Sequence, residues 1–202
     1  MKIKKIKFKK SFCSGYNKNG IYIEKGVKVF AGASVWFGNV IMGESEVGTN
    51  CELLPYNYIE GAKIGENCVV GPFARLRKES VIGCNCKIGN FVEIKNSLLG
   101  KNVKVAHLTY VGDAEIGDNC NLGCGVVFCN YDGKNKHKCK VGQNVFVGSN
   151  SNLIAPLVVG DDCFIGAGTT VTEDLESDSF AIGRVKQKVR QNKFIKDIAE
   201  EQ

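Results

Sequence analysis

The stretch Ile64-Gly-Glu-Asn-Cys-Val-Val70-Gly-Pro-Phe-Ala-Arg-Leu76-Arg-Lys-Glu-Ser-Val-Ile82 carries an aliphatic residue at every sixth position. The same interval continues in both directions, with a few five-residue steps. The marked residues are Ile23, Val29, Val35, Ile41, Val47, Leu53, Ile59, Ile64, Val70, Leu76, Ile82, Ile88, Ile94, Leu99, Val105, Val111, Ile116, Leu122, Val141, Val147, Leu153, Val159, Ile165 and Val171. Such a fixed short period is typical of a solenoid, whereas a helix or a hairpin sheet has a different period.

The residues around each marked position indicate how the chain turns. Glycine often follows the aliphatic residue, as at Gly65 and Gly83, and glycine suits a tight turn because it tolerates positive φ. The residue four positions after the aliphatic is usually small or apolar, as at Cys68 and Ala74. We therefore predict triangular coils, with one short parallel strand on each side and the aliphatic side chains stacked inside.

Composition excludes several classes of protein. The 202 residues carry a net charge of +6, with lysines crowded into the first ten residues and more positive charge over 184–196. No aromatic residues alternate with these cations in a nucleic-acid-binding pattern, so a solvated chain end is the simpler interpretation. No apolar run is long enough to span a membrane, and the start lacks the apolar region of a secretory signal. We expect a cytoplasmic protein.

The ten cysteines do not form a metal or disulfide pattern. No Cys-x-x-Cys spacing occurs, and disulfides are rare in cytosolic proteins. The cysteines at the small inward position of the repeat are Cys51, Cys68, Cys86, Cys120 and Cys163. They are interpreted as small buried packing residues, and no metal is expected to be required.

Four segments follow from the repeat. Residues 1–20 form a basic arm, either poorly ordered or a first irregular coil, and residues 21–183 form the solenoid. Within the solenoid, residues 128–140 break the period and form a loop ejected from one coil. Residues 184–202 form a C-terminal arm, which is expected to contain a short helix. Its apolar side would hold Val189, Phe194 and Ile198.

The motifs outside the repeat carry a resemblance to one family. They are Gly71-Pro-Phe-Ala-Arg-Leu-Arg77, Gly89-Asn-Phe-Val-Glu-Ile-Lys95, His107-Leu-Thr-Tyr110, Gly112-Asp-Ala-Glu-Ile-Gly117, Cys129-Asn-Tyr-Asp-Gly-Lys-Asn-Lys136, Val145-Phe-Val-Gly-Ser149 and Gly166-Ala-Gly-Thr-Thr-Val-Thr172. Over residues 20–184 the chain resembles the C-terminal acetyltransferase domain of the bifunctional bacterial N-acetylglucosamine-1-phosphate uridyltransferase/glucosamine-1-phosphate acetyltransferases. The resemblance implies an all-β, single-stranded left-handed parallel β-helix and an acetyl-CoA-dependent acyltransferase.

The resemblance also implies roles for individual residues. The general base matches His107, and Asn130 and Ser149 are implied to assist the reaction. The residues matching sugar-phosphate ligands are Arg77, Lys95, Tyr110 and Asn121, with Lys136 and Glu93 as further candidates. Those matching acetyl-CoA contacts are Cys124, Asn130, Tyr131, Ser149, Ala167 and Arg184. Cys124 stands where the family usually has alanine, which alters the wall of the thioester pocket slightly.

The residue types agree with these roles. Arg77 and Lys95 are 18 residues apart, or one coil, so they are predicted to stack as a phosphate clamp. The alternative is a pair of solvated cations. The other histidine is His137, which lies in the ejected loop. Glu93 is expected either to orient His107 or to bind a sugar hydroxyl, and Ser149 either to stabilise an oxyanion or to complete a tight turn.

Three functions remain open from the sequence. The first is N-acetylation of glucosamine-1-phosphate on the route to UDP-N-acetylglucosamine. The second is acyl transfer to another amino sugar, free or nucleotide-linked, and the third is a non-catalytic subunit of a nucleotidyltransferase. The family's nucleotidyltransferase domain has no counterpart in these residues, so a separate protein is expected to supply that step. Flat prism faces make poor pockets, and a homotrimer with its sites between subunits is therefore expected.

Overall fold

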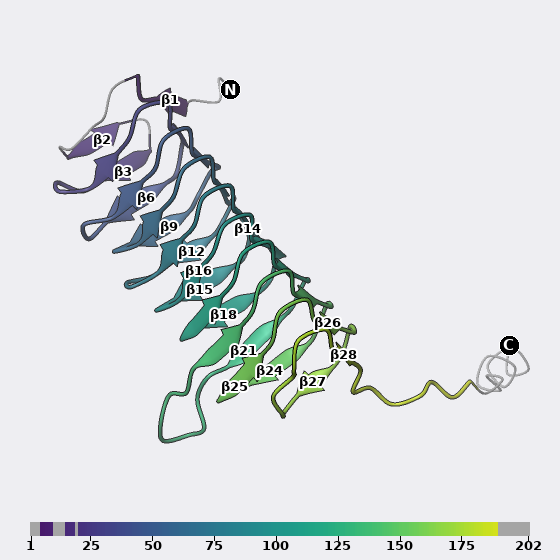
Figure 1. Cartoon of the computed structure of the whole chain (residues 1–202). Helices are drawn as coiled ribbons and strands as arrows, with labels where there is room; N and C mark the ends of the chain where they lie inside the picture. The colour runs from purple at the N-terminus through teal and green to yellow at the C-terminus, as the bar shows by residue number, and fades with distance from the viewer. Residues whose placement is uncertain (1–4, 10–14, 19, 190–202) are drawn as a thin grey trace, which may run out of the picture.

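The chain forms a straight prism of stacked coils (Figure 1). The computed structural model describes residues 5–9, 15–18 and 20–189. Within these ranges the secondary structure is β-strand and turn, without a helix, and therefore without a helix that could cross a membrane. The strands form three sheets along the prism, here called A, B and C, so the predicted parallel β-helix is confirmed.

The strands are short and follow the repeat. Sheet A contains β1 (Lys5–Lys7), β5 (Ser34–Trp36), β8 (Glu52–Leu53), β11 (Val69–Val70), β14 (Lys87–Asn90), β17 (Lys104–His107), β20 (Asn121–Leu122), β23 (Phe146–Val147), β26 (Phe164–Ile165) and β28 (Phe180–Ala181). Sheet B contains β4 (Lys28–Val29), β7 (Glu46–Val47), β10 (Lys63–Ile64), β13 (Val81–Ile82), β16 (Leu98–Leu99), β19 (Ala114–Ile116), β22 (Cys139–Val141) and β25 (Leu157–Val159). Sheet C contains β2 (Tyr16–Lys18), β3 (Ile21–Ile23), β6 (Val40–Met42), β9 (Tyr58–Glu60), β12 (Arg75–Leu76), β15 (Glu93–Lys95), β18 (Tyr110–Gly112), β21 (Val127–Cys129), β24 (Asn152–Ile154) and β27 (Thr170–Val171).

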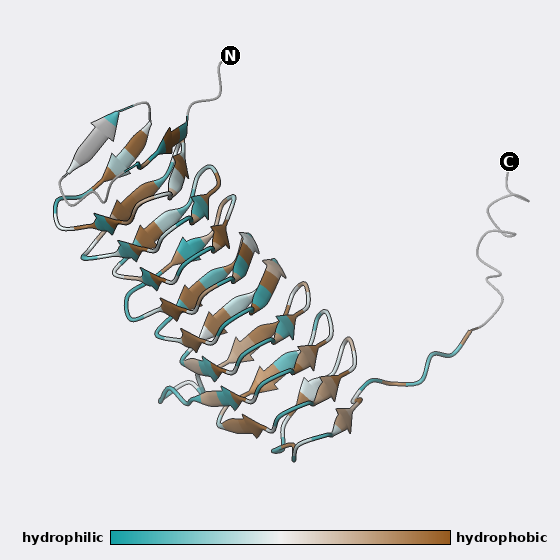
Figure 2. Ribbon diagram, turned by 45° about the horizontal axis from the view of Figure 1, so that its top comes forward, coloured by the Kyte–Doolittle hydropathy of each residue, from teal (hydrophilic) through white to brown (hydrophobic). Residues whose placement is uncertain are grey.

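The aliphatic repeat forms the core. Each marked residue pairs with its counterpart one coil away, as Ile64 does with Ile82 and Ile82 with Leu99. Every one of the marked residues is 5% exposed or less. Figure 2 shows the hydrophobic colour concentrated in the strands and the hydrophilic colour in many of the turns. Each coil therefore buries its apolar residues against its neighbours.

Most glycines after the marked residues serve a different purpose from the one predicted, although Gly71 has the expected positive φ, 101°. Gly65 and Gly83 do not have positive φ; instead, a Cβ on Gly83 would lie 2.3 Å from the carbonyl oxygen of Gly100 in the next coil. The positive φ falls two residues later, on asparagines such as Asn67 (55°) and Asn85 (60°). Asparagine tolerates this left-handed conformation better than most residues. Glycine is therefore needed here for the close approach of coils.

The cysteines of the repeat are buried, as predicted. Their exposure is 1% or less for Cys51, Cys68, Cys86, Cys120 and Cys163. They are more than apolar filling, because each thiol donates to a carbonyl of the next coil, for example Cys68 Sγ to Gly83 O at 3.0 Å. Burial raises the pKa of the Cys120 thiol, which favours the neutral donor form.

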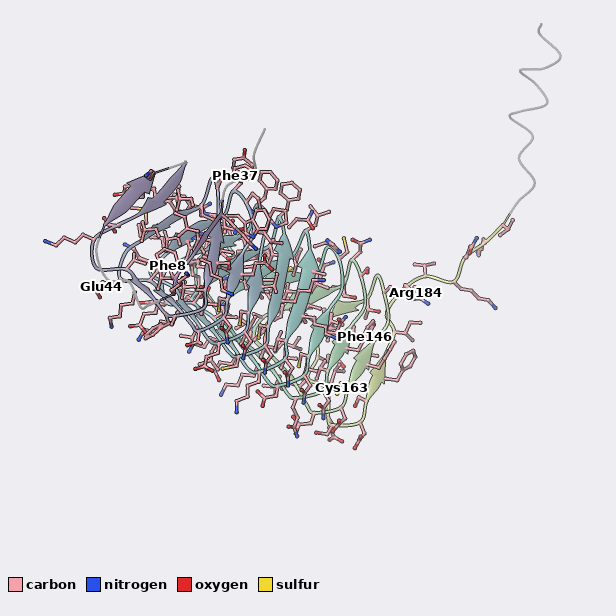
Figure 3. All side chains as sticks on the ribbon, turned by 90° about the horizontal axis from the view of Figure 1, so that it is seen from above. Phe8, Phe37, Glu44, Phe146, Cys163 and Arg184 are labelled. Carbon is pink, nitrogen blue, oxygen red and sulfur yellow. The ribbon has the colours of Figure 1, made fainter. Side chains whose placement is uncertain are left out.

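The two ends of the prism differ from the expectations. Strand β1 pairs with β5 and β2 with β3, both antiparallel, and Phe8 is buried at the N-terminal end (Figure 3). Part of the basic arm thus covers the first coil. At the other end, residues 184–189 have no regular secondary structure, so the expected helix does not begin there. The remainder of that helix, with Phe194 and Ile198, lies outside the described residues.

The irregular positions share one edge of the prism. The edges are named after the sheets that they join: A–C, C–B and B–A. The five-residue steps lead from Ile59 to Ile64, from Ile94 to Leu99 and from Val111 to Ile116, and each crosses the C–B edge. The ejected loop leaves from the same edge, between β21 and β22 (Figure 1). The loop proper is 130–138, because the residues flanking it on each side belong to strands.

Phe128 anchors the loop to the core, and its loss should be costly. It occupies the inward position of β21 and is 1% exposed. We expect Phe128→Ala to lower the free energy of unfolding by about 3–5 kcal/mol, because it leaves a cavity in a narrow core. Phe30→Ala, at a ring that is 38% exposed, should cost much less. Denaturant unfolding followed by circular dichroism tests this, and equal losses for the two variants would contradict it.

Candidate functional site

Three cations from separate segments converge at the C–B edge. Arg77 follows β12 and Lys95 ends β15, and the pairing of Leu76 with Ile94 places their side chains one coil apart on sheet C. Lys136 comes from the ejected loop and is close enough to Lys95 for the two ammonium groups to affect each other. Figure 3 shows the side chains projecting outward along the prism. The predicted stacking of Arg77 on Lys95 is thus what the register produces.

The closeness of these cations has an electrostatic consequence. The interaction with Lys136 is the largest cause that lowers the pKa of Lys95, followed by burial; Arg77 contributes in the same direction and Asp113 opposes it. Like charges at short range disfavour each other's charged form. The three side chains therefore bring positive charge together at this edge. Arg77 and Lys95 also line a hollow of about 320 Å³, with Lys78, Asn96 and the carboxylates Glu60 and Glu79. Such a site is suited to an anion, and a phosphate provides the geometry for Arg77.

Glu93 does not contact His107. Its carboxylate accepts a hydrogen bond from Arg77 Nη1 at 2.9 Å and lies 3.7 Å from Arg75 Nη1. Within one chain, Glu93 is therefore bonded to arginine and not to His107. The physical reason is that β15 places Glu93 outward on sheet C, beside the arginines of the previous coil. Glu93 holds Arg77 in place and remains half-buried.

Gly112 provides the space in which Tyr110 and Asn130 meet. A Cβ on Gly112 would lie 2.3 Å from Tyr110 Oη and 2.8 Å from Asn130 Nδ2. Gly112 pairs with Lys95 in the neighbouring coil. The absence of a side chain therefore allows a hydroxyl and an amide to come together directly beside the cations. These are the groups that hydrogen-bond sugars.

The ejected loop is ordered by its own contacts. Tyr131 bridges to Lys136, and Tyr131 Oη donates to Gly133 O at 2.7 Å. The Asp132 carboxylate accepts the backbone N–H groups of Lys134 and Asn135 and lies 2.6 Å from His137 Nε2. These bonds, that from Asn135 first, lower the pKa of Asp132. His137 is thus a structural residue of the loop.

His107 lies on the opposite edge of sheet C, the A–C edge. It ends β17, its side chain is exposed, and its Nδ1 lies 2.5 Å from Asn90 Oδ1. Since an amide oxygen only accepts, Nδ1 carries the proton and donates to Asn90. In the neutral ring, Nε2 of this exposed side chain is then the proton acceptor. Asn90 was not singled out from the sequence, although its spacing of 17 residues from His107 is one short coil.

The residues matched to acetyl-CoA contacts form a column on the same A–C edge. Cys124 follows His107 one coil further on, and Ser149 and Ala167 occupy the next two coils, in the register set by β20, β23 and β26. Arg184 Nη1 donates to Ala167 O at 2.7 Å, at the end of the prism where the chain leaves it (Figure 3). The column gives an extended surface for a long ligand. Asn130 and Tyr131, which were also matched to acetyl-CoA contacts, lie apart from it on the ejected loop.

The predicted residues thus divide between two faces. Arg77, Lys95 and Tyr110 project from sheet C, whereas Asn121 projects from sheet A between Lys104 and Phe146. Side chains on two faces of a prism diverge, so one chain cannot direct both sets at one small ligand. His107 lies on the edge that the two faces share.

The described residues contain no group of three or more histidine, cysteine, aspartate or glutamate side chains placed to hold a metal ion.

Besides Asn90, Asp113 is a residue of the site that was not singled out from the sequence. It is 5% exposed and bonded to Asn96 and Asn130.

Comparison with known proteins agrees with this architecture. Residues 138–173 match the family described as bacterial transferase hexapeptide, six repeats, and residues 55–131 match the GMPPB C-terminal domain. The chain is 53% identical over 144 residues to the bifunctional protein GlmU of Caldicellulosiruptor saccharolyticus, covering 71% of this chain and 31% of that protein. It is 44% identical over 186 residues to GlmU of Clostridium acetobutylicum, covering 84% and 41%.

Residues 138–173 thus carry the hexapeptide repeat of bacterial transferases. Over 71–84% of its length, the chain corresponds to the C-terminal domain of the bifunctional protein GlmU, and it spans less than half the length of these relatives.

The pKa of Lys95 can be measured directly. We expect Lys95, in protein whose lysines carry ¹³C-methyl groups, to titrate below the other lysines in NMR spectra. Lys136→Gln removes the neighbouring cation and should therefore raise the pKa of Lys95. Lys140→Gln, on sheet B beside Glu115, is the matched control and should leave it unchanged. A Lys95 signal that titrates with the bulk of the lysines would contradict the charge cluster.

Proposed function

We propose that this protein transfers the acetyl group of acetyl-CoA to the amine of glucosamine-1-phosphate, giving N-acetylglucosamine-1-phosphate. The observation that carries the proposal is the convergence of Arg77, Lys95 and Lys136 beside Tyr110 and Asn130. That set offers positive charge for a phosphate next to hydrogen-bonding groups for a sugar. Similarity to GlmU over most of the chain supports it.

The phosphate would bind where the cations repel one another. A dianion placed between Arg77, Lys95 and Lys136 neutralises this excess charge, and Arg77, held by Glu93, is free to use its remaining N–H groups. The sugar ring would then extend over Tyr110 and Asn130. This arrangement selects an amino sugar that carries a single terminal phosphate.

His107 would act as the general base. Its Nε2 takes a proton from the acceptor's ammonium group, and the free amine attacks the thioester carbonyl of acetyl-CoA. The C–N bond forms, the nitrogen loses its second proton, and the C–S bond breaks. One of the two protons passes to the departing thiolate and the other to solvent. The hydrogen bond to Asn90 keeps the ring in the tautomer that this step needs.

Acetyl-CoA would lie along the A–C edge. Cys124 lines the thioester region, Ser149 supplies a hydroxyl or backbone N–H to the oxyanion, and Ala167 and Arg184 follow toward the end of the prism. Arg184 is placed to reach the phosphates of the coenzyme. Tyr131 and Asn130 would have to meet the coenzyme from the C–B edge of another copy.

We further propose a homotrimer in which sheet A of one copy faces sheet C of the next. Asn121 and the cation cluster would then reach one ligand from two chains. Sheet A also carries an exposed stack formed by Phe146, Phe164 and Phe180, with ring centroids 4.7 and 5.6 Å apart. Exposed aromatic strips of this kind mark interfaces.

Acetyl transfer can be tested by thiol release. We expect release of coenzyme A thiol from acetyl-CoA with glucosamine-1-phosphate, little with glucosamine or UDP-glucosamine, and loss of about 100-fold or more in His107→Ala. Asn90→Ala should lose less, because the base remains but its tautomer is no longer fixed. His137→Ala is the matched control and should retain most activity.

If coenzyme A thiol is released only with another amino sugar, that sugar is the acceptor in place of glucosamine-1-phosphate. No release with any amine would favour a non-catalytic subunit and would sink the proposal.

The shared site predicts complementation between two inactive variants. Asn121→Ala damages the sheet A contribution and Lys95→Ala the sheet C contribution. Random mixed trimers of the two would contain intact sites at about one quarter of the interfaces, so activity should return on mixing after dissociation and reassembly. Mixing Lys95→Ala with Arg77→Ala, both on sheet C, should restore nothing. A fully active monomer would contradict the arrangement.

A further inference from the structure

A buried carboxylate lies at the foot of the ejected loop. Asp113 follows β18 at the C–B edge, has a φ of 52° and is 5% exposed. One carboxylate oxygen accepts a hydrogen bond from Asn96 Nδ2 at 2.5 Å, and the other accepts one from Asn130 Nδ2. The donors come from the coil before and the coil after. A buried charge is stable only with such partners, so this position is specific to a carboxylate.

Asp113 contacts both stems of the loop. Its side chain holds Asn130, where the chain leaves the coil, and its carbonyl oxygen accepts the backbone N–H of Cys139, where the chain returns, at 3.2 Å. No other residue between 20 and 189 is bonded to both of these positions. Asp113 thus ties both stems of the 130–138 loop to the scaffold, while Lys138 is also held by the N–H of Leu157 and the carboxylate of Glu115.

The same residue is beside the cation cluster. Its backbone N–H donates to Lys95 O at 3.1 Å, and its negative charge favours the charged form of Lys95. Lys136 is carried on the loop that Asp113 fastens. The position of Lys136 against Lys95, and of Asn130 beside Tyr110, therefore depends on this carboxylate.

We propose that Asp113 is a positioning residue for the acceptor: through Asn130 and the two loop stems it places the loop's Lys136 and Asn130 against the scaffold's Lys95 and Tyr110. Asp113 does not touch the substrate. The inference rests on the proposed acetyl transfer, which it deepens by assigning the residue that assembles the sugar-phosphate side of the site.

An equivalent carboxylate elsewhere in the fold provides the comparison. Asp162 lies at the B–A edge with a φ of 58° and accepts a hydrogen bond from Asn144 Nδ2 at 2.9 Å. It is exposed and carries no loop. Both aspartates have the same turn conformation and accept a hydrogen bond from an asparagine amide of the previous coil. Only Asp113 of the two is buried and contacts the loop.

The central variant is Asp113→Asn in the full chain. Asparagine keeps the size and tolerates positive φ, but it has only one accepting oxygen for two amide donors. We expect the KM for glucosamine-1-phosphate to rise about tenfold or more, because one hydrogen bond of a buried network is lost. The KM for acetyl-CoA should change by less than about threefold, since the Ser149 and Ala167 column lies on the other edge. Asp162→Asn should resemble the wild type.

A second variant moves the charge instead of removing it. In Asp113→Asn/Asn96→Asp, the carboxylate introduced at position 96 accepts a hydrogen bond from the amide introduced at position 113. The oxygen of that amide accepts the hydrogen bond from Asn130. Both hydrogen bonds and the net charge return, so the KM for the sugar phosphate should recover to within about threefold of the wild type. If Asp113 were needed only for stability, a folded Asp113→Asn protein would keep the wild-type KM. The double variant would then have no raised KM to restore.

Hydrogen–deuterium exchange over 130–139 gives a reading that does not depend on activity. Faster exchange in Asp113→Asn and recovery in the double variant are expected. Wild-type kinetics and exchange in Asp113→Asn overturn the proposal, as does a folded double variant whose KM stays high. If the single variant fails to fold, the double variant decides alone. A wild-type protein without acetyl transfer sinks the proposed function instead, and the exchange result still judges the role of Asp113.

Discussion

Each coil is kept in register because the aliphatic side chain on each of its sides stacks on the equivalent side chain of the next coil. The other features of the molecule follow from that contact. Ile64, Ile82 and Leu99 are a short section of the column, and their burial is what makes parallel strands of two or three residues stable. Once the register is fixed, the spacing between outward residues is fixed as well. The fixed register therefore places Arg77 next to Lys95, and no additional contact between these two residues is needed.

The register also gives two edges of the prism different properties. The A–C edge is regular, and its column from His107 to Ala167 repeats one position in successive coils. The C–B edge is irregular, and it gathers Lys95, Lys136 and the buried Asp113 around a loop. A long coenzyme suits the first arrangement, and a small charged acceptor suits the second. Bringing an A–C edge and a C–B edge together requires two chains, which is why the proposed site lies between subunits.

The fold and the stacking of Arg77 on Lys95 were predictable because both depend on the period. The sequence misled where a contact lies between coils. Glycine was assigned to positive φ, although Asn85 takes that conformation and Gly83 allows close approach. Asn90 and Asp113 were missed because their partners are 17 residues away, the length of a coil with one short step. The position of the loop against Lys95 could not be deduced, since the loop lies outside the repeat.

The short steps and the loop share the C–B edge, and this has a consequence for how such a chain can change. A coil there has already accepted 17 residues, or many more, without disturbing its neighbours' stacking. Loops of different length and charge could be grafted at that edge while the A–C edge, where we propose that the coenzyme binds, stays intact. The scaffold would then remain constant while one loop varies. Changes in that loop would alter the acceptor preference without altering the residues proposed to bind the acyl donor.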